Sequence, residues 1–102
     1  MKGQPYTLAL YRVKPGYEDE FIKRWRSLAE TFSSLPSPPI WGTLIRSTSE
    51  PGVFYSFGPW RDASDDASMR ANPTAQQAFA QIGALCIEMT PGNFEVVEHV
   101  VV

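Results

Sequence analysis

The chain has 102 residues, with 9 basic against 11 acidic side chains and a formal net charge of −2. This length suits one domain with a modest core, so residues 1–102 are expected to form a single domain. The charges are interspersed without a basic cluster, which argues against nucleic acid or an anionic membrane as a partner. One cysteine, Cys86, excludes an intramolecular disulfide, and the N-terminus lacks signal-peptide features, so we expect a cytoplasmic protein.

The first third of the chain predicts a strand and then a helix. Tyr6 to Val13 has the length and the β-formers of a strand, which ends at Lys14-Pro15-Gly16. From Tyr17 to about Ser34, apolar residues recur at spacings of four, three and four, which is typical of an amphipathic helix. These residues are Phe21, Trp25, Leu28 and Phe32. The prolines between Leu35 and Pro39 end that helix.

The middle of the chain predicts a hairpin. Ile40 to Thr48 forms its first strand, Glu50-Pro51-Gly52 its tight turn, and a second strand begins at Val53. Alternation along this strand places Val53, Tyr55 and Phe57 on one side and Phe54, Ser56 and Gly58 on the other. Neither side is polar, so both faces of the strand need a cover.

The last third predicts two helices and a strand. After Trp60, a cap and acidic residues indicate a short helix to about Ala71, and Asn72-Pro73 opens a second main helix. The expected buried stripe of this helix is Ala75, Phe79, Ile82, Cys86 and Met89. Pro91-Gly92 is expected to end it, and Phe94 to Val102 to form the final strand.

The predicted order is β-α-β-β-α-β, the ferredoxin-like arrangement of the α+β class. It forms a four-stranded antiparallel sheet with helices on one face. The other face would carry residues of the third and fourth strands, including some of Val96, Val97, Val100 and Val101. We therefore expect a homodimer whose two sheets close face to face.

Four features in this order resemble the antibiotic biosynthesis monooxygenase family of the dimeric α/β barrel superfamily. They are Val13-Lys-Pro-Gly16 before acidic residues, Trp25 in the first helix, Leu44-Ile-Arg-Ser47 before a Pro-Gly turn, and the aromatic strand that ends in Trp60. The resemblance implies two ferredoxin-like protomers forming a dimeric α/β barrel, with a pocket between each sheet and its helices. Members resembling this chain include cofactor-independent oxygenases that act on polyketide anthrones or quinols.

The residues restrict the chemistry further. A facial-triad iron site needs two histidines, and the sequence has only His99. No Gly-x-Gly-x-x-Gly or phosphate loop is present, which argues against nicotinamide or flavin bound by those motifs. The haem-degrading relatives use a histidine on the helix after the strand-three tryptophan, and none occurs here. What remains is chemistry without a cofactor, in which a deprotonated phenol or enol reduces the cosubstrate O₂ directly.

Three residues are the candidate catalytic groups. Trp60 matches the tryptophan that lines the pocket in related oxygenases, and its indole N–H suits a developing oxyanion. Tyr55 is a candidate proton donor or acceptor, and His99 is a candidate base because histidine is the side-chain type suited to proton transfer at neutral pH. The alternatives are core packing for Trp60 and Tyr55, and a surface or dimer contact for His99.

Four further residues are candidate substrate-binding groups. Trp41 suits either a pocket entrance or a dimer edge. Arg46 and Arg70 would favour a phenolate, although Arg46 is also explained as solvated and Arg70 as the partner of Asp66 one helical turn earlier. Met69 would shape an apolar pocket or fill a gap in the core.

The expected function is monooxygenation of an aromatic polyketide, anthrone or quinol by a small homodimer. Two alternatives stay open on the same fold. One is a non-catalytic binding or accessory protein, and the other is a cyclase or isomerase that transfers protons without oxygen.

Overall fold

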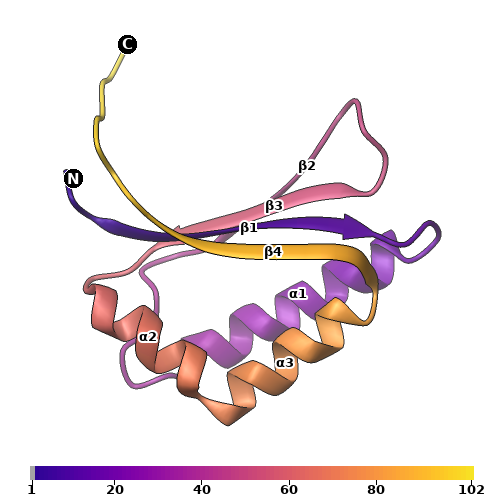
Figure 1. The fold of residues 1–102 in the computed structure, drawn as a ribbon, viewed down its shortest axis with the longest axis horizontal. Coiled ribbons are helices and arrows are strands. Elements are labelled where there is room, and N and C mark those ends of the chain that lie inside the picture. Colours follow the sequence, from indigo (N-terminus) through magenta and orange to yellow (C-terminus); the bar gives the residue numbers. More distant parts are fainter. Residues whose placement is uncertain (1) are drawn as a thin grey trace.

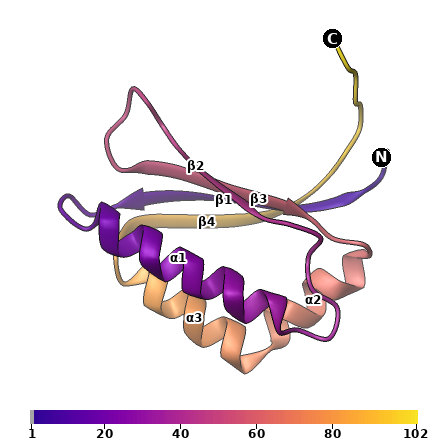
Figure 2. The same cartoon turned by 180° about the vertical axis from the view of Figure 1, so that it is seen from behind.

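The computed structural model describes residues 2–102, which form a four-stranded antiparallel sheet with three helices on one of its faces (Figures 1 and 2). The strand order is β2-β3-β1-β4. This confirms the predicted ferredoxin-like class. The strands are β1 (Pro5–Val13), β2 (Thr43–Arg46), β3 (Val53–Pro59) and β4 (Cys86–Glu95), and the helices are α1 (Glu18–Ser33), α2 (Ala63–Ala71) and α3 (Pro73–Gly83).

The predicted starts of the two later helices are confirmed by their caps. The Asp62 side chain accepts a hydrogen bond from the Ser64 backbone N–H at the start of α2. At the start of α3, Asn72 Oδ1 accepts from the backbone N–H groups of Thr74 and Ala75. Each cap satisfies N–H groups that a helix leaves without an internal partner.

The predicted end of α3 is wrong. The helix stops at Gly83, and Cys86 and Met89, which were expected on its buried stripe, belong to β4. Met89 still packs on the core, because alternation along β4 directs it toward the helices opposite Tyr11 of β1. Pro91 and Gly92 do not end a helix but lie inside β4, which tolerates a proline because it is an edge strand.

β2 is also shorter than predicted. The extended stretch expected over 40–48 pairs with β3 only from Thr43 to Arg46. Just before it, residues 40–42 lie outside the ladder, although the Ile40 backbone N–H donates to the Pro59 carbonyl at the end of β3. The turn at Gly52, with φ of 79°, and the antiparallel β2–β3 hairpin are as predicted.

The core lies between the sheet and the helices. Ala9, Tyr11 and Val13 of β1 point toward the helices and are buried. Phe21 of α1 is at the centre, fully buried, with its ring 5.0 Å from that of Tyr11 and 4.8 Å from that of Phe54. The amphipathic stripe read from the sequence of α1 therefore faces the sheet.

The opposite face of the sheet is open and apolar, and we call it the open face. It carries Tyr55 and Phe57 of β3, as the alternation predicted, and Leu8 and Leu10 of β1 opposite them. Figure 1 shows the C-terminal segment after β4 and the β2–β3 hairpin rising on this side, away from the helices. Residues 96–102 belong to that segment and not to a strand, so the valines expected on the sheet face lie beyond it.

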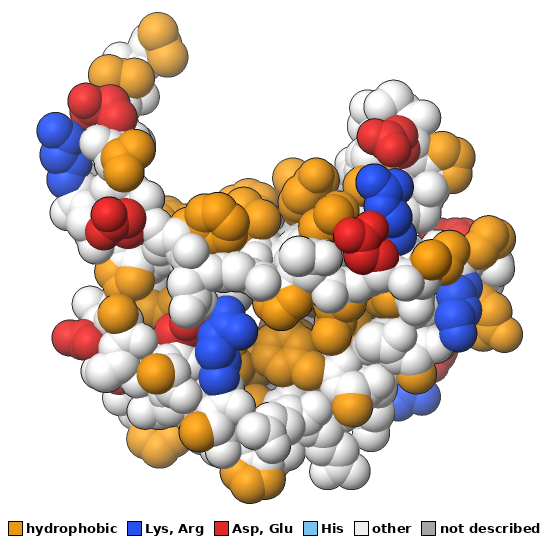
Figure 3. All heavy atoms as spheres, in the orientation of Figure 1, with side chains coloured by type: hydrophobic (Ala, Val, Ile, Leu, Met, Phe, Trp, Pro, Cys, Tyr) orange, Lys and Arg blue, Asp and Glu red, His pale blue; other side chains and the backbone are white. Residues whose placement is uncertain are grey.

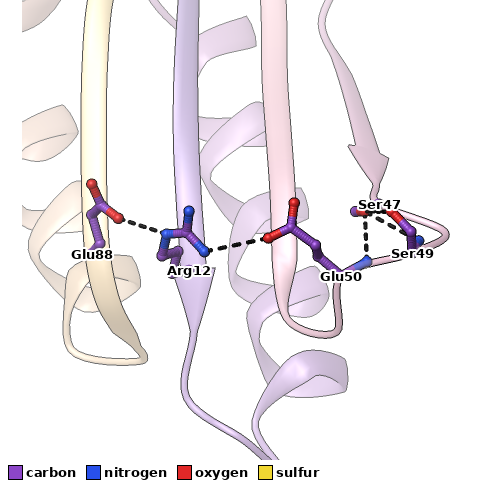
Figure 4. Close-up of polar contacts among 5 residues, drawn as sticks. All are labelled: Arg12, Ser47, Ser49, Glu50 and Glu88. Carbon is purple, nitrogen blue, oxygen red and sulfur yellow. Dashed lines mark hydrogen bonds and ion pairs between the residues drawn. The ribbon is translucent and has the colours of Figure 1, made fainter.

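One end of the open face carries an ion-pair cluster around Arg12 (Figure 4). Arg12 Nε donates to Glu88 Oε1 of β4 at 2.8 Å, and Arg12 Nη1 lies 3.8 Å from Glu50 Oε2 in the β2–β3 turn. All three side chains are between 45% and 66% exposed, so each pair contributes roughly 0.2–1 kcal/mol. No helix within residues 2–102 has both the length and the apolar character that a bilayer crossing requires.

Candidate active site

A cavity of about 480 Å³ lies between the helix-facing side of the sheet and helices α1 and α3. Figure 3 shows hydrophobic side chains inside the hollow between these layers. Ala9 of β1 and Gly58 of β3 form part of its floor, and their small size leaves the space open. The aromatic side chains of its walls include Trp25, Phe32, Trp60 and Phe79.

One wall depends on the close approach of two backbones. A Cβ atom at Gly58 would lie 2.2 Å from the Trp41 carbonyl oxygen, a distance that no side chain can occupy. Gly58 therefore allows the segment before β2 to lie directly on β3. That approach brings the Trp41 backbone to the edge of the cavity, while the Trp41 ring packs edge-on against Tyr6 and Phe57 of the open face.

A chain of hydrogen bonds closes one end of the cavity. The Trp60 indole N–H donates to Thr7 Oγ1 at 2.5 Å, and the Thr7 hydroxyl donates to Asp66 Oδ1 at 3.1 Å. Asp66 Oδ2 accepts from Arg70 Nε at 3.2 Å, and Arg70 Nη2 donates to Asn93 Oδ1 at 2.7 Å. Thr7, Trp60 and Arg70 line the cavity, while Asp66 lies behind them and is 5% exposed.

Further along β1, a second polar group faces the cavity. Tyr11 and Ser56 share a hydrogen bond of 2.9 Å between their hydroxyl oxygens, and both line the cavity. Burial raises the pKa of Tyr11, and the hydrogen bond with Ser56 offsets part of that effect. The phenol of Tyr11 therefore stays protonated well into the alkaline range and acts as a hydrogen-bond donor or acceptor, not as a base.

The raised pKa of Tyr11 predicts a loss of stability at high pH. The folded protein keeps this proton after an unfolded chain, whose tyrosines titrate near ~10, has released it. The stabilising contribution is complete below that pH and is lost as the pH rises through the folded-state pKa. Urea unfolding at a series of alkaline pH values should show a steeper decline for wild type than for Tyr11→Phe, and parallel declines would contradict this assignment.

The cavity brings together three of the residues predicted from the sequence. Trp60 is 1% exposed at one end, Trp41 lies at the edge, and Arg70 reaches the same end as Trp60. The predicted Arg70–Asp66 pair is present. The indole N–H of Trp60 is not free, however, because Thr7 accepts its hydrogen bond.

The other four predicted residues lie outside the cavity lining. Tyr55 is on the open face, 39% exposed, because it alternates with Ser56 along β3. His99 lies in the segment after β4 and not in a strand, so the expectation that it sits in the last strand is wrong. Arg46 lies over the Phe54 ring, with its Cζ atom 5.4 Å from the ring centroid. Met69 is buried in a small cluster with Trp60 and Ala75.

The sequence reading missed four residues of the site, namely Thr7, Tyr11, Ser56 and Asp66. A signal for three of them existed in strand alternation. Thr7 and Tyr11 are each two residues from the buried Ala9 and so share its face of the sheet, and Ser56 shares the helix-facing side with Phe54 in the same way. The sequence predicts Asp66 only as the partner of Arg70. Among residues 2–102, no cluster of three or more His, Cys, Asp or Glu side chains forms a candidate metal site.

A family model described as antibiotic biosynthesis monooxygenase matches residues 6–81, which span β1 to α3 and so include most of the cavity lining. The chain belongs to the antibiotic biosynthesis monooxygenase family. The matched region contains Thr7, Tyr11, Ser56, Trp60 and Arg70, whereas β4, which closes the edge of the sheet, lies beyond it. No curated protein matches the sequence.

Solved structures of similar fold include members of this family. SnoaB from Streptomyces nogalater, described as a cofactor-independent oxygenase, aligns with a TM-score of 0.85 at 18% identity over 96% of this chain and 97% of its own. A structure described as an antibiotic biosynthesis monooxygenase aligns with a TM-score of 0.77 at 20% identity, covering 92% and 99%. A conserved protein from Methanosarcina mazei Go1 aligns with a TM-score of 0.80 at 16% identity, covering 92% and 93%. At these identities the likeness establishes the fold alone.

Proposed function

We propose that this family member is a monooxygenase that uses O₂, without a metal or flavin, to oxidise a planar aromatic polyketide, anthrone or quinol. The observation that carries the proposal is the pairing of aromatic walls with a cation at one end of the cavity. A flat ring system would stack against Trp25 and Phe79, and an oxygen substituent would reach Arg70 and the Thr7 hydroxyl. Such cavities, mostly apolar with a few convergent polar groups, are typical of small-molecule sites.

Arg70 is the residue best suited to stabilise negative charge on the substrate. A guanidinium has five N–H groups, and the hydrogen bonds to Asp66 and Asn93 use two of them. The remaining donors can bind an oxygen that becomes anionic during the reaction. The indole N–H of Trp60 would not bind the developing oxyanion, because it donates to Thr7. Trp60 would instead form a wall of the cavity and hold Thr7 in place.

The chemistry follows from the substrate's own electrons. Loss of a proton from a phenol, enol or anthrone gives an electron-rich anion, which is oxidised as it reduces O₂. For an anthrone, one oxygen atom forms a carbonyl at the reacting carbon, and the other leaves as water with the two hydrogens of the original methylene. The protein binds the ring, stabilises the anion and keeps bulk water out of the cavity.

Oxygen uptake by metal-stripped protein with a panel of anthrones and reduced naphthoquinones tests this function. Arg70→Gln should lower catalysed uptake roughly 100-fold, the usual effect of removing an oxyanion donor, and Trp60→Phe should lower it less. Arg24→Gln, an exposed change on α1, is the matched control and should match wild type. Uptake by wild type no faster than the spontaneous reaction would instead favour the alternatives, a binding protein or a cyclase or isomerase. The absence of Tyr55 and His99 from the cavity lining supports the binding protein over the cyclase or isomerase, which needs a group that transfers protons.

We also propose that the protein works as a homodimer through the open face. This face is apolar, with Ile45, Tyr55 and Phe94 at least 39% exposed, and Figure 3 shows it as a concave surface between two projections. Exposed apolar surface of this kind is typical of an interface. Light scattering should give twice the monomer mass of 11.4 kDa for wild type, and Ile45→Asp should shift it toward the monomer. A monomeric wild type at micromolar concentration would contradict the proposal.

A further inference from the structure

Asp66 is a buried carboxylate that does not line the cavity but contacts two residues that do. Its Oδ1 accepts from the Thr7 hydroxyl and its Oδ2 from Arg70 Nε. The side chain of Asp66 is 7% exposed, whereas that of Arg70 is 37% exposed and faces the cavity. The cation that a ligand meets is therefore already paired on the side away from the ligand.

The charges around the cavity cancel once Asp66 is included. The charged residues of the lining are Arg26 and Glu30 of α1 and Arg70 of α2, a net excess of one positive charge. Asp66 supplies the second negative charge directly behind Arg70. In a partly desolvated site, a paired carboxylate at this distance strongly reduces the attraction that its cation exerts on an anion.

We infer that Asp66 is the counter-ion that sets the charge of the cavity, so that the cavity takes up its aromatic ligand as the neutral phenol, quinol or quinone and not as the anion. This inference rests on the proposed use of the cavity for such ligands. It also fits the proposed reaction, because a site that binds the neutral form keeps the spare donors of Arg70 for charge that develops only after binding. Asp66 is thus a positioning residue, since it acts through Arg70 and Thr7.

Replacement of Asp66 by asparagine isolates its charge from its geometry. The amide oxygen can still accept from Arg70 Nε, and the amide N–H can donate to Thr7 Oγ1, which keeps the Trp60 hydrogen bond through its second lone pair. Asp65→Asn is the matched control, because it is the same change at the neighbouring position of α2, which is only partly buried.

The test measures dissociation constants, by quenching of tryptophan fluorescence, for naphthoquinone and for its 2-hydroxy derivative, which is an anion at neutral pH. Wild type should bind naphthoquinone at least as tightly as the anion. Asp66→Asn should tighten the anion on the order of tenfold and leave the neutral quinone within about twofold, while Asp65→Asn changes neither. Arg70→Gln should weaken the anion selectively, which tests the same charge balance if Asp66→Asn does not fold.

Three outcomes would overturn the inference: wild type binds neither probe, wild type prefers the anion, or Asp66→Asn changes both affinities equally. The last outcome is what a purely structural role would produce. Neither probe consumes oxygen during the measurement, so the result is separate from the test of oxygenation. A charge effect without oxygen uptake would uphold the role of Asp66 and reject the monooxygenase.

Discussion

Replacing Gly58 with alanine is expected to lower the free energy of unfolding by about 3 kcal/mol and to displace the segment that carries Trp41. The added Cβ would lie 2.2 Å from the Trp41 carbonyl oxygen, and this neighbour is backbone, which cannot rotate away as a side chain would. Overpacking of this kind typically costs about 1–3 kcal/mol, and the cost is at the upper end where a backbone must shift. Because the Trp41 backbone borders the cavity beside Gly58, ligand affinity should fall as well.

Gly42→Ala is the matched control for this change. A Cβ at Gly42 meets only the Trp25 ring, at 3.9 Å, which is an ordinary van der Waals contact. Chemical denaturation of both variants should separate them by at least 2 kcal/mol, on the scale expected for overpacking. Equal midpoints and slopes would show that the 40–42 segment moves away from β3 at little cost.

The largest loss of stability is expected for Phe21→Ala, at roughly 3–5 kcal/mol. Phe21 has no exposed surface and packs between the rings of Tyr11 and Phe54, so its removal leaves a cavity between α1 and the sheet that rigid strands cannot fill. A domain of this size has a total stability on the order of 5–15 kcal/mol, so much of it would be lost.

Thermal and urea unfolding of Phe21→Ala beside Tyr17→Ala would test this expectation. Tyr17 is half exposed at the start of α1, so removal of its ring should cost far less. Similar losses in the two variants would contradict the central place of Phe21 in the core.

The order of elements and the class of fold were predictable because apolar residues recur at regular spacings over residues 6–34 and 53–60. Proline and glycine residues also mark clearly where the elements end. The boundary between α3 and β4 was not, for a physical reason. Apolar residues at 75, 79, 82, 86 and 89 continue a helical spacing across the point where the chain turns into a strand, and Met89 packs against the core from the strand as it would from a helix. The pairing of β4 with β1 decided the outcome, and the sequence alone does not show that pairing.

The site was predictable to a smaller extent. Trp60, Trp41 and Arg70 lie at the cavity, but Tyr55 does not, although it is only one residue from Ser56, which does. Neighbouring residues of a strand point to opposite faces of the sheet. Whether a strand residue reaches the cavity therefore depends on which face the helices cover. Thr7 and Asp66 are separated by 59 positions in the sequence and meet only through the fold.

The two outer strands of the sheet influence how copies of the protein meet at high concentration. β2 pairs over only four residues, and β4 carries Pro91, which has no N–H to offer a further strand. An exposed strand that is short or interrupted in this way is a poor template for the backbone ladder of a fibril. Concentrated solutions of the protein should therefore resist growth of continuous intermolecular β-structure, even though the open face of the sheet is apolar.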